Sequence, residues 1–336
     1  MEREAMLYEA LPGGRVRCHV CQWRCLINPG KPGVCRMRIN RDGKILALNY
    51  AEVSSMAADH IEKKPLFHFF PGTHAFSLGS WGCNFHCKGC QNWEISCVDI
   101  PAASQRLLPE REIELTRDYK CQGIAWTYNE PAIWLEYTLD SAKLAKDSNL
   151  YTVYVTNGYA TPEALDAIGP WLDAWRVDIK GFTDGFYRQL ARIPHWRGIL
   201  DVAKRAKDKW HMHVEVVTNI IPTMNDDDEQ LTNIATWIRD NLGDLTPWHV
   251  TRFHPLHEFT GLSATPLSTL EKAHRIGKKA GLKFVYLGNV PGHEYENTVC
   301  YSCGKVVVHR IGYDTRVVGL HGSKCTFCGA ELNFRV

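Results

Sequence analysis

The sequence predicts an α/β fold built on a parallel sheet, with a short cysteine-rich segment on each side of it. Between residues 71 and 297, short apolar runs alternate with longer amphipathic stretches, as is typical of repeated βα units. Of the 13 cysteines, all but Cys97 and Cys121 fall into three tight groups. The chain has 336 residues, of which 45% are hydrophobic and 23% charged, so a large globular core is expected.

Three parts are predicted: an N-terminal cysteine-rich segment over 1–70, a barrel over 71–297 and a C-terminal zinc-ribbon-like module over 298–336. Helix-length segments separate the expected strands, and one of them begins at Pro131, a residue favoured at the first helical position. A closed or nearly closed sheet would be a partial TIM-type (β/α)6 barrel, although an open doubly wound sheet gives the same pattern. The strands are expected at 75–78, 123–127, 151–156, 175–179, 213–218, 250–253 and 283–287.

Charge and hydropathy exclude several functional classes. The formal net charge is +2, so nucleic acid is not indicated as a partner by bulk electrostatics. No apolar run approaches the roughly 18 residues that span a bilayer, and no apolar stretch follows the first charged residues as it would in a secretory signal. We therefore expect a cytoplasmic protein without a membrane span. In such a chain, clustered cysteines more often bind metal than form disulfides.

The central cysteine group follows the first predicted strand of the barrel. Cys83, Cys87 and Cys90 have the spacing C-x3-C-x2-C, and flanking glycines allow the backbone to turn tightly. Three thiolates on one loop can hold three irons of a [4Fe–4S] cluster and leave the fourth iron open for a ligand. A zinc knuckle that borrows a distant ligand such as His86 is the alternative. The position at the carboxyl end of a strand is where βα barrels build active sites.

This motif resembles that of the radical S-adenosylmethionine (SAM) superfamily. The resemblance implies that the open iron binds SAM and that an external electron donor drives its reductive cleavage. The products would be methionine and a 5′-deoxyadenosyl radical, which abstracts hydrogen from a substrate. The resemblance does not identify that substrate. One departure is Gly89, which replaces the aromatic residue that usually precedes the last cysteine, so the adenine contact must lie elsewhere.

Residues 59–72, together with the Gly-Cys-Asn-Phe run at 82–85 and the Cys-Gln-Asn-Trp run at 90–93, resemble one subfamily more closely. They are similar to the radical SAM component of the AmmeMemoRadiSam family, a relative of pyruvate formate-lyase activating enzymes. The likeness extends over nearly the whole chain. It implies association with Memo-type and AMMECR-type proteins as partners.

The same resemblance implies a set of SAM contacts at the ends of successive strands. Asn129 and Glu130 stand where the superfamily has the Gly-Gly-Glu motif that binds the methionine amino group. An acidic oxygen facing an ammonium group gives a charge-assisted hydrogen bond. Glu130 as a simple helix cap before Pro131 is the alternative. Thr156 and Asn157 end the next predicted strand and belong to the same expected set.

Two further contacts are expected later in the chain. Asp178 and Lys180 share one strand face and resemble the Asp-x-Lys motif that lines the SAM pocket of activating enzymes. An ordinary internal ion pair is the alternative for them. Asn289, after the last predicted strand, resembles the adenine-side loop of the family.

The C-terminal cysteines form two C-x2-C knuckles in a segment too short to bury a core of its own. Metal binding would supply the missing folding free energy, and the pattern is typical of a zinc ribbon, with rubredoxin-like iron as the alternative. The expected ligands are Cys300, Cys303, Cys325 and Cys328.

The N-terminal cysteines form another four-residue set, and the Pro-Gly turns at 29–30 and 32–33 would return the last of them to the others. A closed zinc site is the first expectation, and a second [4Fe–4S] cluster serving electron delivery is the alternative. Ligands shared between the two ends of the chain also remain open. The set is Cys18, Cys21, Cys25 and Cys35.

The function expected from the sequence is that of a radical SAM enzyme, with the cofactor performing the difficult chemistry. A glycyl-radical-enzyme activase acting on a partner protein is a second hypothesis, and a glycyl radical enzyme encoded beside the gene would favour it. A non-catalytic iron–sulfur and zinc binding module is a third. A protein that binds a cluster but never cleaves SAM would favour that third hypothesis.

Overall fold

The computed structural model describes residues 2–336, and the chain divides into two compact units. Unit 1 comprises Met1–Asp59, His74–Trp175 and Leu190–Met212, and unit 2 comprises His60–Thr73, Arg176–Gln189 and His213–Val336. Both units are assembled from segments that are separate in the sequence. The predicted division into three continuous parts remains a prediction.

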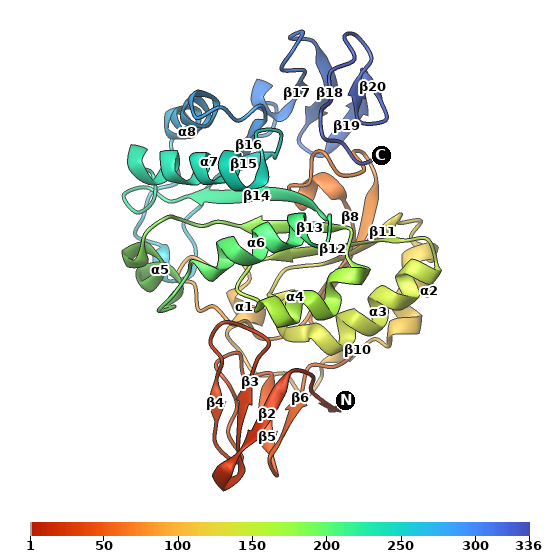
Figure 1. Ribbon diagram of the computed structural model, residues 1–336, viewed down its shortest axis with the longest axis vertical. Helices are drawn as coiled ribbons and strands as arrows, with labels where there is room; N and C mark the ends of the chain where they lie inside the picture. The colour runs from red at the N-terminus through yellow and green to blue at the C-terminus, as the bar shows by residue number, and fades with distance from the viewer. Residues whose placement is uncertain (1) are drawn as a thin grey trace. The chain divides into compact units, whose positions relative to one another are not determined.

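The sheet of unit 1 is parallel, as the βα pattern predicts. β11 (Gly123–Trp126) pairs with β9 (His74–Gly79) on one side and with β12 (Tyr151–Thr156) on the other. Every residue of β11 is buried, as is common in parallel sheets covered on both faces. The helices α2 (Pro109–Asp118), α3 (Leu135–Asp147) and α4 (Pro162–Ile168) pack beside one another, α3 against both others (Figure 1).

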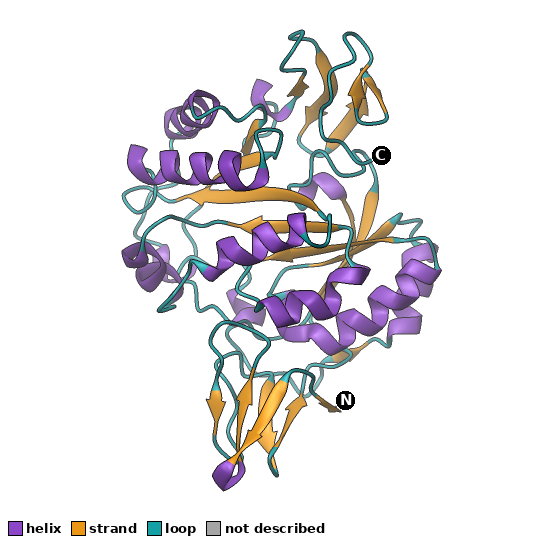
Figure 2. Ribbon diagram, in the orientation of Figure 1, coloured by secondary structure: helices purple, strands orange, loops and turns teal. Residues whose placement is uncertain are grey.

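The N-terminal part of unit 1 is built from short antiparallel strands (Figure 2). One sheet has the order β1-β6-β5 and the other the order β2-β3-β4. Their tight connections bring cysteines that are up to 17 residues apart in the sequence into one region, from Cys18 to Cys35. The bounds are β1 (Arg3–Glu4), β2 (Tyr8–Leu11), β3 (Arg15–Cys18), β4 (Leu26–Ile27), β5 (Arg38–Arg41) and β6 (Lys44–Ala47).

Unit 2 contains a second set of parallel strands. β15 (Trp248–Arg252) lies between β14 (His213–Ile220) and β16 (Val285–Gly288). The helices α7 (Asp228–Leu242) and α8 (Leu267–Lys279) pack against each other, and α8 covers β15 and β16. α7 begins directly after Asp227, whose side chain caps the helix by accepting a hydrogen bond from Gln230 N at 2.8 Å.

The C-terminal segment of unit 2 has little regular structure beyond small antiparallel sheets. β18 (Val306–Ile311) pairs with β17 (Thr298–Val299) and β19 (Asp314–Val317), while β20 (Leu320–His321) pairs with β21 (Lys324–Cys325). Its apolar side chains pack with residues from elsewhere in unit 2. That cluster includes Phe67, Phe284, Tyr286, Val307, Val308, Leu332 and Phe334.

The remaining elements are short or fall near the boundaries between the units. They are β7 (Glu52–Val53), which pairs with β10 (Gln105–Arg106), β8 (Ser55–His60), α1 (Trp93–Ser96), β13 (Ala174–Asp178), α5 (Asp184–Ala191) and α6 (Gly198–Asp208). Six 3-10 helices complete the described chain: η1 (Pro12–Gly14), η2 (Ile61–Lys63), η3 (Pro131–Trp134), η4 (Gly169–Trp171), η5 (His257–Phe259) and η6 (Glu294–Glu296).

The predicted mixed α/β class and the seven predicted strands are confirmed, with strand ends displaced by at most two residues. The predicted helix after Glu130 is present as η3 followed by α3. The partial TIM-type (β/α)6 barrel and the zinc-ribbon character of the C-terminal segment remain predictions. Among the described helices, none is long and apolar enough to cross a membrane.

Candidate functional site

The loop that carries Cys83, Cys87 and Cys90 begins where β9 ends and is braced by the side chain of Asn129. This amide accepts a hydrogen bond from Ser80 N at 3.1 Å and donates one to Gly82 O at 2.8 Å. Asn129 therefore links the end of β11 to the backbone that leads into the first cysteine.

Gly82 occupies a position that other residues would fill only with strain. Its φ is +77°, in the left-handed region that glycine adopts readily. A Cβ atom there would lie 2.6 Å from the backbone oxygen of Cys35. The loop of the central cysteines is therefore packed directly on the backbone of the N-terminal cysteine group.

Glu130 is buried and is held in place by hydrogen bonds within unit 1. Its carboxylate accepts hydrogen bonds from Ala132 N at 3.0 Å, from Thr156 Oγ1 at 2.7 Å and from Asn157 N at 2.8 Å. The helix cap that the sequence left as an alternative is thus present. The same carboxylate also ties the end of β12 to the start of η3, so it fixes two strand-end loops at once.

Asn157 reaches the first cysteine of the central motif. Its Nδ2 lies 2.8 Å from Asn84 Oδ1 and 3.9 Å from Cys83 Sγ, while its Oδ1 accepts from Tyr159 N at 2.9 Å. The four strand-end residues predicted in unit 1 are therefore brought together around this loop. They are Asn129, Glu130, Thr156 and Asn157.

The surroundings of Cys83 suit a thiolate only when a cation is bound. Burial, and after it the charge of Glu130, raises the pKa of the Cys83 thiol well above its ordinary value. Phe85 N donates a hydrogen bond to Cys83 Sγ at 3.4 Å, as expected for a sulfur that carries negative charge on metal binding. Asn84 Nδ2 is buried nearby without a hydrogen-bond partner. Three thiols on a tightly turning loop therefore fit an iron–sulfur cluster.

Within unit 2, Asp178 and Lys180 form the ion pair that the sequence left as an alternative. Lys180 Nζ lies 2.7 Å from Asp178 Oδ2, and Arg176 contacts the other carboxylate oxygen. Burial disfavours the charged carboxylate, but the Arg176 and Lys180 cations outweigh it and hold the pKa of Asp178 below its ordinary value. Asn289 is exposed, and its side chain donates to Arg252 O at 3.0 Å.

The C-terminal cysteines converge on one point in unit 2. The sulfurs of Cys300 and Cys328 are 3.6 Å apart, those of Cys303 and Cys325 are 3.8 Å apart, and all four lie within 4.8 Å of one another. Sulfurs bound to one zinc at about 2.3 Å in tetrahedral geometry would be separated by about 3.8 Å. This group is therefore shaped to hold a single metal ion.

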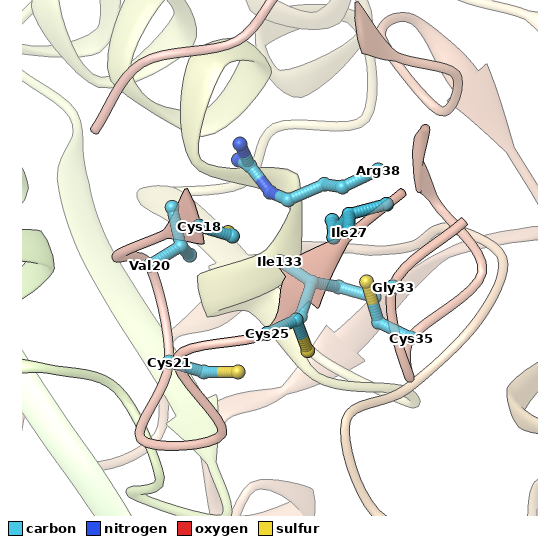
Figure 3. A pocket seen from close by; sticks show the side chains of 9 residues that line it. All are labelled: Cys18, Val20, Cys21, Cys25, Ile27, Gly33, Cys35, Arg38 and Ile133. Carbon is cyan, nitrogen blue, oxygen red and sulfur yellow. The ribbon is translucent and has the colours of Figure 1, made fainter. Parts of the chain in front are cut away.

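The N-terminal cysteines have a different arrangement within unit 1. Cys18, Cys21, Cys25 and Cys35 line one cavity together with apolar side chains (Figure 3). Arg38 lines the same cavity, and its guanidinium binds the Glu136 carboxylate at 2.7 Å.

Sequence reasoning missed several residues that organise these sites. Trp23 donates from Nε1 to Asn84 O at 2.7 Å, and Asn92 donates to Tyr128 O at 2.6 Å on the other side of the central cysteines. The partners of Trp23 and Asn92 are distant in the sequence, so no local pattern announces these contacts. Asn92 belongs to the Cys-Gln-Asn-Trp run at 90–93, and that run was the available signal for it.

The central part of the chain carries a radical SAM superfamily domain. Residues 80–235 match the radical SAM superfamily, and they include the three central cysteines and the loops that surround them. A radical SAM methyltransferase from Sphaerobacter thermophilus has a similar fold, with a TM-score of 0.50 and 15% identity over 71% of each chain.

The chain is also similar in sequence to curated proteins. The uncharacterized protein MJ0808 of Methanocaldococcus jannaschii is 41% identical over 336 residues, which cover 98% of this chain and 99% of the relative. The chain therefore belongs to the same family as MJ0808. The pyruvate formate-lyase-activating enzyme of Clostridium pasteurianum is 25% identical over 179 residues, covering 50% of this chain and 72% of the relative.

Proposed function

We propose that this protein cleaves SAM reductively and uses the resulting radical to abstract hydrogen from a substrate that has yet to be identified. The observation that carries the proposal is the convergence of four strand-end side chains on the loop of three cysteines, within a region that matches the radical SAM superfamily. The reaction makes the protein an enzyme that needs an external electron donor.

Cys83, Cys87 and Cys90 would hold a [4Fe–4S] cluster with one iron open to SAM. When bound together, cluster and SAM supply the electron and the 5′-deoxyadenosyl group of the reaction. The protein's own part is to fix the loop, through Asn129 on its backbone and Asn157 on Cys83. Neither residue needs to transfer a proton for the reaction to occur.

SAM itself would be held by the side chains at the strand ends. We assign the methionine amino group to Glu130, whose buried carboxylate would be neutralised by an ammonium group. Asn129, Thr156 and Asn157 would complete that side of the pocket. Asp178, Lys180 and Asn289 are proposed for the carboxylate and adenine sides, on the strength of the family resemblance.

The subfamily proposed is the radical SAM component of the AmmeMemoRadiSam system, a cytoplasmic enzyme with Memo-type and AMMECR-type proteins as partners. The residues that support it are the runs at 59–72, 82–85 and 90–93. For the C-terminal cysteines we propose a structural zinc ion, because their sulfur separations match a single tetrahedral ion.

A second candidate function is activation of a glycyl radical enzyme. The observation that favours it is the sequence similarity to the activating enzymes of Clostridium pasteurianum and Clostridium scatologenes. In this case the abstracted hydrogen would come from a glycine of a partner protein. A glycyl radical signal in a co-purified partner would distinguish it from small-molecule chemistry.

The experiment that tests the proposal is the formation of 5′-deoxyadenosine. The protein is reconstituted anaerobically with iron and sulfide, then supplied with dithionite and SAM. We expect product from the wild type and from Cys121→Ala, a cysteine outside the three groups, but none from a variant with Cys83, Cys87 and Cys90 all changed to Ala. A wild-type protein with a full cluster and no product would favour the non-catalytic binding module instead.

A further inference from the structure

The N-terminal cysteines line one cavity, but their sulfurs are not gathered as closely as those of a single-ion site. Three of the four cysteines are buried, and Figure 3 shows their side chains arranged around the space rather than in mutual contact. Among the described residues, the group whose sulfurs converge within 4.8 Å is the C-terminal one. A single zinc ion would draw four thiolates to that kind of separation.

The lining of the cavity supplies thiols and one cation and is otherwise apolar. Apart from the cysteines and Arg38, it consists of Val20, Ile27, Gly33 and Ile133. Iron–sulfur clusters are held by cysteine thiolates, and hydrogen bonds to their sulfurs and their exposure to solvent set the reduction potential.

Arg38 provides an independent indication of an anionic occupant. Its side chain is buried, and Nη2 binds both oxygens of Glu136 at 2.7 and 2.9 Å. Its Nε and Nη1 are buried without any hydrogen-bond partner. A buried donor without a partner lowers the stability of the fold by about 1–3 kcal/mol, and by more on a charged group. An acceptor bound in the cavity would remove this loss. Sulfurs of a cluster held by four thiolates, with its net negative charge, would supply such an acceptor.

We propose that this cavity binds a second [4Fe–4S] cluster, ligated by Cys18, Cys21, Cys25 and Cys35. Because four protein ligands leave no open iron, it would bind no SAM and would instead carry electrons. The assignment does not depend on the reaction proposed for the central cysteines, since it concerns a different ligand set. It selects the iron–sulfur alternative that the sequence left open beside zinc.

The proposed second cluster would lie close to the loop of Cys83. Trp23, between two of the N-terminal ligands, donates to Asn84 O, and the backbone of Cys35 contacts Gly82. The residues Asn84 and Gly82 flank Cys83 on both sides. Each cluster would therefore be separated from the other by little more than one layer of side chains, a distance over which two reduced clusters interact magnetically.

The experiment uses the full chain with Cys83, Cys87 and Cys90 changed to Ala, so that the central cluster cannot form. After anaerobic reconstitution we expect about four irons and about four sulfides per chain, with the absorbance and reduced electron paramagnetic resonance (EPR) spectrum of a [4Fe–4S] cluster. Adding Cys18→Ala and Cys21→Ala should abolish all three signals. Adding Cys97→Ala and Cys121→Ala instead, as the matched control outside the three cysteine groups, should leave iron and sulfide unchanged.

A triple variant that holds zinc and no iron would overturn the assignment, and so would one iron without sulfide. Because the triple variant alone distinguishes these outcomes, the test survives even if the variant with five substitutions does not fold. Arg38→Lys in the triple variant gives a second readout. It keeps the charge beside Glu136 but removes the Nε and Nη1 donors, so we expect full iron content with a more negative reduction potential. An unchanged potential would show that Arg38 does not bond to the occupant.

Discussion

The two terminal cysteine groups have similar sequence motifs but opposite geometry. Both contain a C-x2-C pair, yet the C-terminal sulfurs lie 3.6 and 3.8 Å apart in pairs, whereas the N-terminal cysteines line a cavity without such convergence. The C-terminal knuckles turn on Gly304 and Gly329, both with positive φ, which directs the sulfurs inward. Of the N-terminal cysteines, Cys18 ends β3, Cys21 and Cys25 lie between β3 and β4, and Cys35 lies between β4 and β5. Backbone conformation, rather than the spacing of the cysteines in the sequence, therefore decides whether a group is arranged for a single metal ion or for a cluster.

The largest expected effect is the loss of the C-terminal metal. Structural zinc contributes roughly 10–16 kcal/mol to the folding of small domains, so removal by a strong chelator should unfold residues 298–336. Limited proteolysis with mass analysis would show cleavage confined to that segment. Exposure to air is the contrasting treatment: zinc has no redox chemistry, so air should bleach the iron–sulfur absorbance and leave the segment resistant. A chelated protein that stays resistant would contradict the structural role.

The second effect concerns the buried charge beside the N-terminal cavity. Arg38→Met leaves the Glu136 carboxylate buried without its cation, and we expect a loss of about 3–5 kcal/mol in the free energy of unfolding. Denaturant titration measures it. The control is Arg24→Met, because the pair of Arg24 and Glu163 is exposed and should contribute about 0–1 kcal/mol. An equal loss in the free energy of unfolding of both variants would contradict the expected difference between the buried and the exposed ion pair.

The third effect separates the pH dependence of the fold from that of the metal sites. Burial raises the pKa of Glu112 to about 7 from 4.5, despite hydrogen bonds from Trp126 and Ser141. The folded chain keeps this proton up to about pH 7 and the unfolded chain loses it near pH 4.5, so stability should fall as pH rises between these values. At about 1.4 kcal/mol per pKa unit, the loss is about 3 kcal/mol.

Glu112→Gln should remove that slope, as denaturant titrations at several pH values would show. Metal sites have the opposite sign, because thiolates are protonated and release metal as pH falls. A variant with the wild-type slope would mean that another group titrates in this range.

The smallest effect tests the contact between the N-terminal cysteines and the central loop. Gly82→Ala introduces a Cβ 2.6 Å from Cys35 O, whereas Gly43→Ala, at nearly the same φ, meets nothing within 4 Å. Both substitutions place a Cβ on a residue with positive φ, which destabilises the folded state by about 1 kcal/mol or slightly more. Only Gly82→Ala should lose additional stability and bind less iron. Equal stability and iron content in the two variants would show that the two loops are not tightly packed.

Much of the fold could be predicted because buried parallel strands are continuous apolar runs with polar ends. The four unit 1 residues that surround Cys83 could be predicted from the resemblance to the radical SAM superfamily. Thr156 ends β12 and Asn157 follows it, while Asn129 and Glu130 lie a few residues beyond β11. The hydrogen-bond partners of Arg38 and Trp23 could not be predicted, because they are far away in the sequence. Glu136 is 98 positions from Arg38, and Asn84 is 61 positions from Trp23. No periodicity records such contacts. The sulfur separations that distinguish the two terminal sites also depend on backbone conformation, which spacing alone does not give.

The most direct test of the central claim, a three-thiolate site that binds SAM, is the EPR spectrum of the reduced protein before and after SAM is added. The account predicts that SAM changes the signal of the central cluster through its open iron. In the variant with Cys83, Cys87 and Cys90 changed to Ala, the remaining cluster signal should be unaffected by SAM. A wild-type spectrum that SAM leaves unchanged, or a SAM response that persists in the triple variant, would contradict it.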